Sequence, residues 1–124
     1  MSDRELTFWT TPPNAFLLAK IGEKVVGMVS FQHNDEQTAE LNRMSVHSDF
    51  RRLGIAKILT EELLKMLRNR GYKRVIASTT CNQVDAHRFY EKFGFRHNRD
   101  ILLGSFLSDY CSGVYVLEYI YDLA

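Results

Sequence analysis

The chain has 124 residues, 45% of them hydrophobic, which suits one domain (residues 1–124) with one core. Its formal net charge of +1 is too small to drive non-specific binding to nucleic acid or to an anionic membrane. No apolar run approaches the roughly 20 residues of a membrane-spanning helix, and the N-terminus lacks the pattern of a secretory signal. We therefore expect a cytoplasmic protein without a membrane segment or a nucleic-acid partner.

The first half of the chain predicts three antiparallel strands. Residues 1–14 carry charges, two aromatic residues and a Pro-Pro pair, and they predict an irregular lead-in. The apolar segments 15–21 and 24–32, joined by a Gly-Glu pair, predict a β-hairpin. Residues 38–46 predict the third strand, which the polar run 47–49 ends.

A long helix and a parallel strand are expected next. Apolar residues recur at helical spacing from Ile55 onward, Arg68 and Arg70 lie in the last turn, and Gly71 follows as a stop signal. Residues 74–80 then form a β-branched run. A strand, helix, strand succession implies a right-handed crossover, so residues 74–80 should lie parallel to the third strand.

The last part of the chain predicts a second helix and a final strand. The helix spans residues 84–93 and ends at Gly94, and residues 95–97 begin another strand. Residues 101–112 show no clear period, whereas residues 114–121 alternate as the two faces of a sheet do. The fold class is therefore α/β or α+β, with a mixed sheet.

Cysteine and histidine usage predicts no metal site. Cys81 and Cys111 lie in apolar or strand-like surroundings, which favours reduced thiols over a disulfide framework. Neither cysteine has a close Cys or His at the spacing of zinc ligands. We expect no metal cofactor.

The junction between the third strand and the long helix has the form R-x-x-G-x-A. A helix N-terminus offers unpaired N–H groups and a positive dipole end, and the small residues Gly54 and Ala56 allow a phosphate to approach closely. Arg51 and Arg52 add positive charge. The loop alone is equally compatible with a solvated Arg pair that precedes an ordinary helix.

Longer motifs give the junction a context. The segments ELNRMSV at residues 40–46, FRRLGIAK at residues 50–57 and AHRFYEKFGFRH at residues 86–97, with VVG at residues 25–27, resemble the GNAT superfamily of acetyl-CoA-dependent N-acyltransferases. Within it they are similar to the camello-like group, which includes aspartate and cysteinyl-conjugate N-acetyltransferases. The resemblance covers residues 14–121. It implies the GNAT fold, a mostly antiparallel mixed sheet flanked by helices, and acetyl-CoA as co-substrate.

The resemblance also implies roles for single residues. The backbone of Met44 and Val46 would pair with the pantetheine arm, and the amide near Met44 would stabilise the oxyanion of the tetrahedral intermediate. Tyr90 would be the general acid, because a phenol with a reference pKa of about 10 stays protonated at neutral pH and can donate to the leaving thiolate. Asn82 lies one residue further from Tyr90 than the usual Asn of the superfamily. The full set of implied cofactor contacts is Met44, Ser45, Val46, Arg51, Arg52, Leu53, Gly54, Ile55, Ala56, Lys57, Asn82 and Phe89.

A carboxylate on the third strand often serves as the base in this superfamily. Glu40, four residues before Met44, occupies the matching position, and a raised pKa near the sheet would help it accept the proton of the ammonium group. The alternative is a solvent-facing strand glutamate. His47 is a weaker candidate for the base.

Two departures from the superfamily leave the acceptor open. Proteins of the camello-like group carry a hydrophobic membrane segment upstream, and a full superfamily domain begins with a strand and one or two helices that wall the acceptor site. Only residues 1–14 precede the first predicted strand, so these elements are expected to be missing or short. The chain is then either a naturally short member of the superfamily or a piece of a longer protein. In the second case the longer protein could associate with a membrane.

The expected function is acetyl transfer to a primary amine by direct attack, with a small molecule or an amino acid as acceptor. A protein or peptide acetyltransferase and an acyl-CoA-binding module without catalysis remain as alternatives. Two copies of the chain could join through the aromatic residues Phe8 and Trp9, or through the edge of the last strand.

Overall fold

The computed structural model describes residues 6–11, 16–80, 83–102 and 115–123. Its elements, in chain order, are β1 Leu6–Thr11, β2 Phe16–Ile21, β3 Lys24–His33, β4 Thr38–Val46, a 3-10 turn Ser48–Phe50, α1 Ile55–Asn69, β5 Arg74–Thr80, α2 Val84–Phe93, β6 Arg96–Leu102 and β7 Tyr115–Asp122. The strands form one seven-stranded sheet in the order β1-β2-β3-β4-β5-β7-β6. Strands β4 and β5 are parallel, and all other neighbours are antiparallel.

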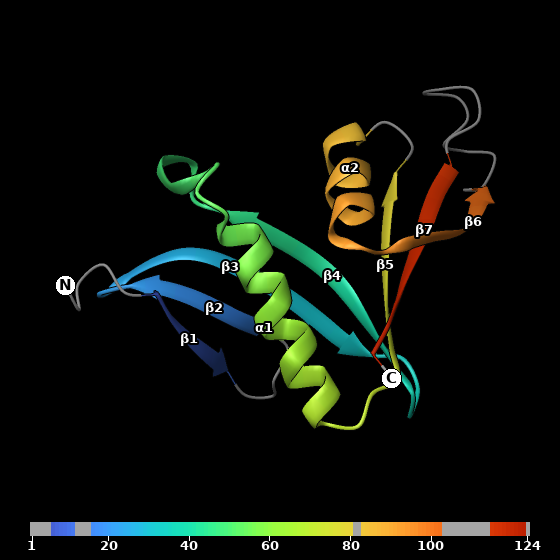
Figure 1. Ribbon diagram of the computed structural model, residues 1–124, viewed down its shortest axis with the longest axis horizontal. Helices are drawn as coiled ribbons and strands as arrows, with labels where there is room; N and C mark the ends of the chain where they lie inside the picture. Colours follow the sequence, from blue (N-terminus) through green and yellow to red (C-terminus); the bar gives the residue numbers. More distant parts are fainter. Residues whose placement is uncertain (1–5, 12–15, 81–82, 103–114, 124) are drawn as a thin grey trace.

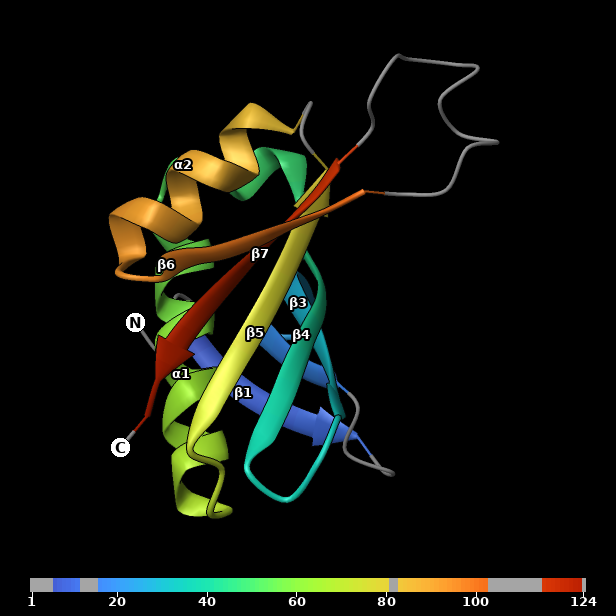
Figure 2. The same cartoon turned by 90° about the vertical axis from the view of Figure 1, so that its right-hand side faces the viewer.

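Both helices cover the same face of the sheet (Figures 1 and 2). The described part of the chain places no helix on the other face, which we call the open face. Strand residues alternate between the two faces. Those that face α1 and α2 are buried, as in β2, where Leu17 and Ala19 are buried while Leu18 between them is only half-buried. The predicted mixed, mostly antiparallel sheet with flanking helices is therefore confirmed.

The core lies between the sheet and its helices, with α1 covering β2, β3 and β4 and with buried residues of β5, α2 and β7 in the same cluster. Buried side chains recur along α1 at helical spacing, which turns one face of this amphipathic helix onto the sheet. Gly27 on β3 lets the helix approach closely, because a Cβ there would lie 3.2 Å from Cγ2 of Ile55. The first turn of α1 is thus held tightly against β3. The buried residues of α1 are Ile55, Leu59, Thr60, Leu63, Leu64 and Leu67.

The prediction of an irregular lead-in over residues 1–14 is wrong for Leu6–Thr11. These residues form β1, which pairs with β2 along its whole length. Leu6 and Phe8 pack against the core, while Trp9 is exposed beneath the ammonium group of Lys20. A short run beside two prolines gives little periodicity, so the pairing with β2 decides the structure. An N-terminal strand is therefore present.

The dimerisation surface proposed from the sequence also needs correction. Phe8 is packed against the core, so it does not form an exposed aromatic pair with Trp9. Strand β7 lies between β5 and β6, so its edge is not available to a second chain. In the described sheet the edge strands are β1 and β6.

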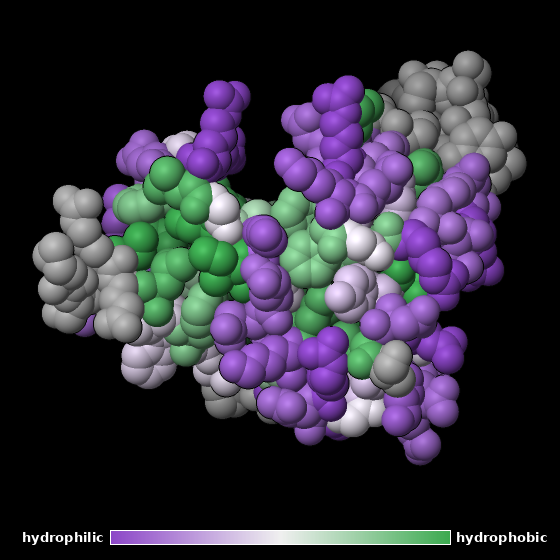
Figure 3. All heavy atoms as spheres, in the orientation of Figure 1, coloured by the Kyte–Doolittle hydropathy of each residue, from purple (hydrophilic) through white to green (hydrophobic). Residues whose placement is uncertain are grey.

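Strands β4 and β5 separate halfway along their length. They pair only from Thr38 to Leu41 and from Arg74 to Ala77, whereas β4 stays paired with β3 up to Val46. Figure 1 shows the two strands diverging toward the N-terminal end of α1. In the space-filling view the surface is hollowed between the loop that precedes α1 and helix α2 (Figure 3). The second half of β4 therefore has one backbone edge without a strand partner.

Candidate active site

The unpaired edge of β4 carries the backbone groups of Met44 and Val46. The amide of His47 donates to the carbonyl oxygen of Val26 over 2.8 Å, so the backbone of His47 faces β3. Because backbone groups alternate along an antiparallel strand, those of Ser45 also face β3 and those of Met44 and Val46 face the side of β5. The Met44 amide thus points into the gap between β4 and β5.

The loop before α1 combines two left-handed residues with an uncapped helix end. Gly54 is the N-cap with φ 80° and no side-chain hydrogen bond, and Arg52 has φ 65°. A Cβ on Gly54 would meet no atom within 4 Å, so the space over the helix end is open. Left-handed backbone beside free N–H groups forms a concavity that suits a phosphate.

The remaining side chains of the loop and of the first turn of α1 differ in their contacts and in their exposure to solvent. The Nε of Arg51 donates to the carbonyl oxygen of Val46 over 3.2 Å, which ties the loop to the unpaired edge of β4. Leu53 and Lys57 are exposed, and Ala56 is half-buried. Ile55 is buried against Gly27, so its side chain faces the core and only its backbone can serve a ligand.

A groove of about 650 Å³ runs between α1 and α2. It brings together Lys57 and Phe89, which the sequence motifs proposed separately. Lys92, Arg68 and Tyr121 were missed, although the spacing of four residues between Phe89 and Phe93 could have indicated this wall. The groove thus offers cations and aromatic rings beside the first turn of α1. The lining residues are Lys57, Glu61, Leu64, Arg68, Phe89, Lys92, Phe93 and Tyr121.

Tyr90 lies on α2, with its ring packed among other aromatic rings. The ring centroids of Phe95 and Tyr119 lie 5.3 Å and 5.7 Å away, and Phe89 makes an edge contact at 5.8 Å. The side chain is only 7% exposed, and this burial raises the pKa of the phenol above its usual value. A raised pKa keeps the hydroxyl protonated at neutral pH, as a proton donor requires.

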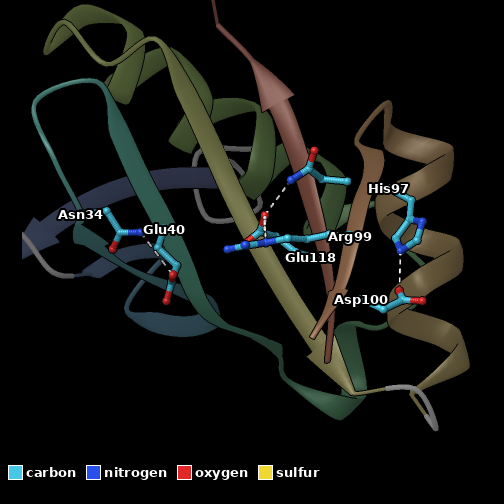
Figure 4. A network of polar contacts seen from close by, with 7 residues as sticks. Asn34, Glu40, His97, Arg99, Asp100 and Glu118 are labelled. Atoms are coloured by element: carbon cyan, nitrogen blue, oxygen red, sulfur yellow. Dashed lines mark hydrogen bonds and ion pairs between the residues drawn. The ribbon is translucent and has the colours of Figure 1, made fainter. Parts of the chain in front are cut away.

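Glu40 lies on the open face, so β4 separates it from the helix face that carries Tyr90. It is half-buried, and the side-chain amide of Asn34 donates to its Oε1 over 3.4 Å (Figure 4). His47 instead caps the 3-10 turn, because its Nδ1 accepts from the amide of Asp49 over 3.1 Å. This turn contact accounts for His47. Asn82 lies outside the described residues.

A buried carboxylate on the open face was not predicted. Glu118 on β7 is 7% exposed and accepts from Asn98 Nδ2 over 2.9 Å and from Arg99 Nε over 3.2 Å (Figure 4). Its signal in the sequence is one acidic residue inside an apolar final strand. Tyr119 was missed too, and its hydroxyl donates to Glu91 over 3.3 Å. Burial is the main cause that raises the pKa of this phenol, and the nearby Glu91 carboxylate is the second.

Among the described residues, no three His, Cys, Asp or Glu side chains lie together as metal ligands would. None of the described helices has both the length and the apolar character needed to cross a membrane.

Comparison with known proteins identifies relatives along most of the chain. N-acetylaspartate synthetase of Rattus norvegicus is 41% identical over 98 residues, which are 78% of this chain and 33% of the relative. N-acetyltransferase 8 of Homo sapiens is 36% identical over 101 residues, and the probable N-acetyltransferase camello of Xenopus tropicalis is 33% identical over 114. The chain spans 44% and 52% of these two proteins, so it corresponds to only a part of each relative.

Solved structures share the fold. A GNAT family acetyltransferase from Elizabethkingia anophelis with acetyl-CoA bound superposes with a TM-score of 0.75 at 20% identity, covering 86% of this chain and 74% of the neighbour. The ribosomal-protein-S18-alanine N-acetyltransferase from Escherichia coli gives a TM-score of 0.71 at 17% identity, with 88% and 68% covered. The model of the acetyltransferase (GNAT) family matches residues 1–95. The chain therefore belongs to the GNAT family of acetyltransferases.

Proposed function

We propose that this chain transfers the acetyl group of acetyl-CoA to a primary amine. The observation that carries the proposal is the unpaired edge of β4, which lies directly beside the phosphate loop before α1. An extended arm that ends in a diphosphate matches both features, since its amides can pair with a free strand edge while its phosphates meet the helix N-terminus. Family membership supports the same ligand.

The residues around the gap between β4 and β5 supply the groups that direct acetyl transfer needs. In this proposal the Met44 amide donates to the oxygen of the thioester, where negative charge develops as the amine attacks. Tyr90, with its raised pKa, donates a proton to the departing thiolate from the helix face. Glu40 takes a proton from the ammonium group of the acceptor on the open face, directly or through water, which leaves the neutral amine that attacks the thioester.

The acceptor is a small molecule or an amino acid in this proposal. The relatives named N-acetylaspartate synthetase support an acceptor of the aspartate kind. The open face supports access by a small acceptor, since no described helix covers it.

One observation favours a second candidate, an acyl-CoA-binding module without catalysis. Only residues 12–15 separate β1 from β2, a length of about one helical turn. The one or two helices expected to wall the acceptor site have no room at this point of the chain. Binding of acetyl-CoA without release of thiol to any amine would favour this second candidate.

A thiol-release assay with acetyl-CoA tests the main proposal. The panel contains free aspartate, a cysteine conjugate, a polyamine and an N-terminal peptide, and we expect thiol release with an amino acid. Preference for the peptide would move the acceptor to proteins.

The role of Glu40 has its own test. We expect Glu40→Gln to lower kcat roughly 100-fold, because the amide cannot take the proton, while the affinity for acetyl-CoA stays the same. Glu36→Gln, an exposed residue in the β3–β4 loop, is the control. A kcat equal to that of the unmodified chain would remove Glu40 from the mechanism.

A further inference from the structure

The open face of β4 contains a β-bulge whose residues have no part in the steps described above. Ser30 on β3 pairs with Arg43 on β4, but the next residue, Phe31, pairs with Leu41. Asn42 is therefore an extra residue in β4. Bulges change the direction in which the following side chains point, and they are common beside active sites.

The bulge decides which face of the sheet Arg43 occupies. Leu41 is buried in the core, and Met44 packs against the same core, where its Sδ accepts from Thr60 Oγ1 over 3.4 Å. In a regular strand, residue 43 would share the face of residue 41 and point into the core. The extra residue puts both Asn42 and Arg43 on the open face, where both are exposed. Without the bulge a guanidinium group would be buried without a partner.

The guanidinium group of Arg43 is available to a ligand. Within the described ranges it makes no ion pair or hydrogen bond through its side chain. By contrast, Arg99 on the same face is held by the buried carboxylate of Glu118 (Figure 4). Asn42 donates to Gln32 Oε1 over 3.1 Å, so the neighbour of Arg43 is also held in place. An unpaired cation therefore lies one residue from Met44, where the thioester is expected.

We propose that Arg43 binds a carboxylate of the acceptor and so selects a free amino acid, a step that rests on the proposed function. Glu40 and Arg43 lie on the same face, about 10 Å apart along the strand. An amino acid that spans them meets the carboxylate of Glu40 with its ammonium group and the guanidinium of Arg43 with its carboxylate. Arginine suits this role because its planar group binds a carboxylate through two parallel hydrogen bonds. The bulge at Asn42 thus makes one strand complementary to a zwitterion.

The test compares L-aspartate with L-aspartic diamide, which keeps the amine and lacks both carboxylates. We expect Arg43→Gln to raise the KM for L-aspartate roughly 10- to 100-fold, with little change in kcat or in the KM for acetyl-CoA. The KM for the diamide should not change, and Arg43→Lys should recover part of the affinity for L-aspartate. Arg74→Gln, an exposed arginine at the other end of the open face, is the matched control.

A binding measurement keeps this inference separate from the proposed function. Calorimetric titration of L-aspartate into the chain saturated with coenzyme A requires no turnover. The role of Arg43 is supported if Arg43→Gln weakens the binding of L-aspartate and Arg74→Gln does not. This result would stand even if no thiol is released, an outcome that would contradict the proposed function alone. Equal binding of L-aspartate by the unmodified chain and Arg43→Gln, or an equal rise in KM for aspartate and diamide, would overturn it.

Discussion

Tyr90 shows how one residue acquires a chemical property from its surroundings. Its motif, AHRFYEKFGF, places a phenol at the seventh position of α2 without indicating whether the ring is buried. In the fold, Phe95 and Tyr119 enclose the ring, and the resulting burial raises the pKa. The hydroxyl then remains a proton donor across the physiological pH range.

Replacing this hydroxyl tests its proposed role. We expect Tyr90→Phe to lower kcat roughly 100-fold, because the thiolate then leaves without a proton, while acetyl-CoA binds with nearly unchanged affinity. Steady-state thiol release and calorimetry measure the two quantities. Tyr72→Phe is the matched control, since the Tyr72 hydroxyl bonds to His33 Nδ1 in another part of the molecule. Equal losses of kcat and affinity in Tyr90→Phe would indicate a packing role.

At the scale of elements, the β4–α1 loop joins two unpaired structures, a strand edge and a helix end. Its left-handed residues differ in cost: glycine adopts φ 80° freely, whereas Arg52 at φ 65° carries strain of about 1–2 kcal/mol. Such strain is commonly retained where backbone N–H groups must face a ligand. The loop geometry therefore supports the phosphate site independently of the side-chain charges.

A charge placed at the helix end tests this site. We expect Gly54→Glu to abolish binding of acetyl-CoA, because the new side chain enters the open space over α1 and repels the diphosphate. Gly71→Glu is the matched control at the other end of α1: Gly71 has φ +95°, and a Cβ there also meets no atom within 4 Å. The two variants share backbone strain and charge, so calorimetry should show loss of binding in Gly54→Glu alone. Comparable affinities in both variants would contradict a phosphate site at this loop.

At the scale of the whole molecule, the sheet divides the proposed chemistry between its two faces. The helix face carries the loop before α1, the groove and Tyr90, and the open face carries Glu40 and Arg43. The gap between β4 and β5 connects the two faces at Met44. An acyl donor and an amine can thus approach the same point from opposite sides of the sheet.

Two buried phenols make the stability of the molecule depend on alkaline pH. Below pH 10, Tyr90 and Tyr119 are protonated in both the folded and the unfolded chain, so neither contributes a pH dependence. Above that pH the unfolded chain releases these protons, but the folded chain, in which both pKa values are raised, keeps them. The free energy of unfolding therefore falls as pH rises above 10, by up to about 1.4 kcal/mol per pH unit for Tyr90. The slope is smaller for Tyr119, because its hydroxyl lies nearer the solvent.

Urea denaturation between pH 8 and pH 11 measures this slope. We expect Tyr90→Phe and Tyr119→Phe each to reduce the slope, since each removes one titrating group. Tyr72→Phe is the comparison for the loss of a tyrosine hydroxyl elsewhere in the molecule. Identical slopes in all of these variants would show that neither phenol keeps its proton in the folded state.

Sequence patterns were sufficient to predict features that depend on a single helix, strand or loop. The apolar spacing from Ile55 onward, the polar run 47–49 that ends the third strand and the R-x-x-G-x-A pattern are local features, so α1, β4 and the loop between them could be predicted. Features that depend on contacts between distant segments could not. β1 exists through its pairing with β2, and the groove exists because α1 and α2 lie side by side.

By itself, the sequence determined the order of strands and helices from residue 16 onward, the loop before α1 and the position of Tyr90 in a helix, because 2-residue and 3.6-residue periods and glycine positions are local properties. Only the tertiary structure decided that β4 and β5 separate after Leu41, that the backbone amide of Met44 faces the gap and that Arg43 faces the open side. The reason is physical: the β4 bulge and the divergence of the strands arise from pairing with β3, β5 and β7, and a bulge reverses the face that alternation assigns to a side chain.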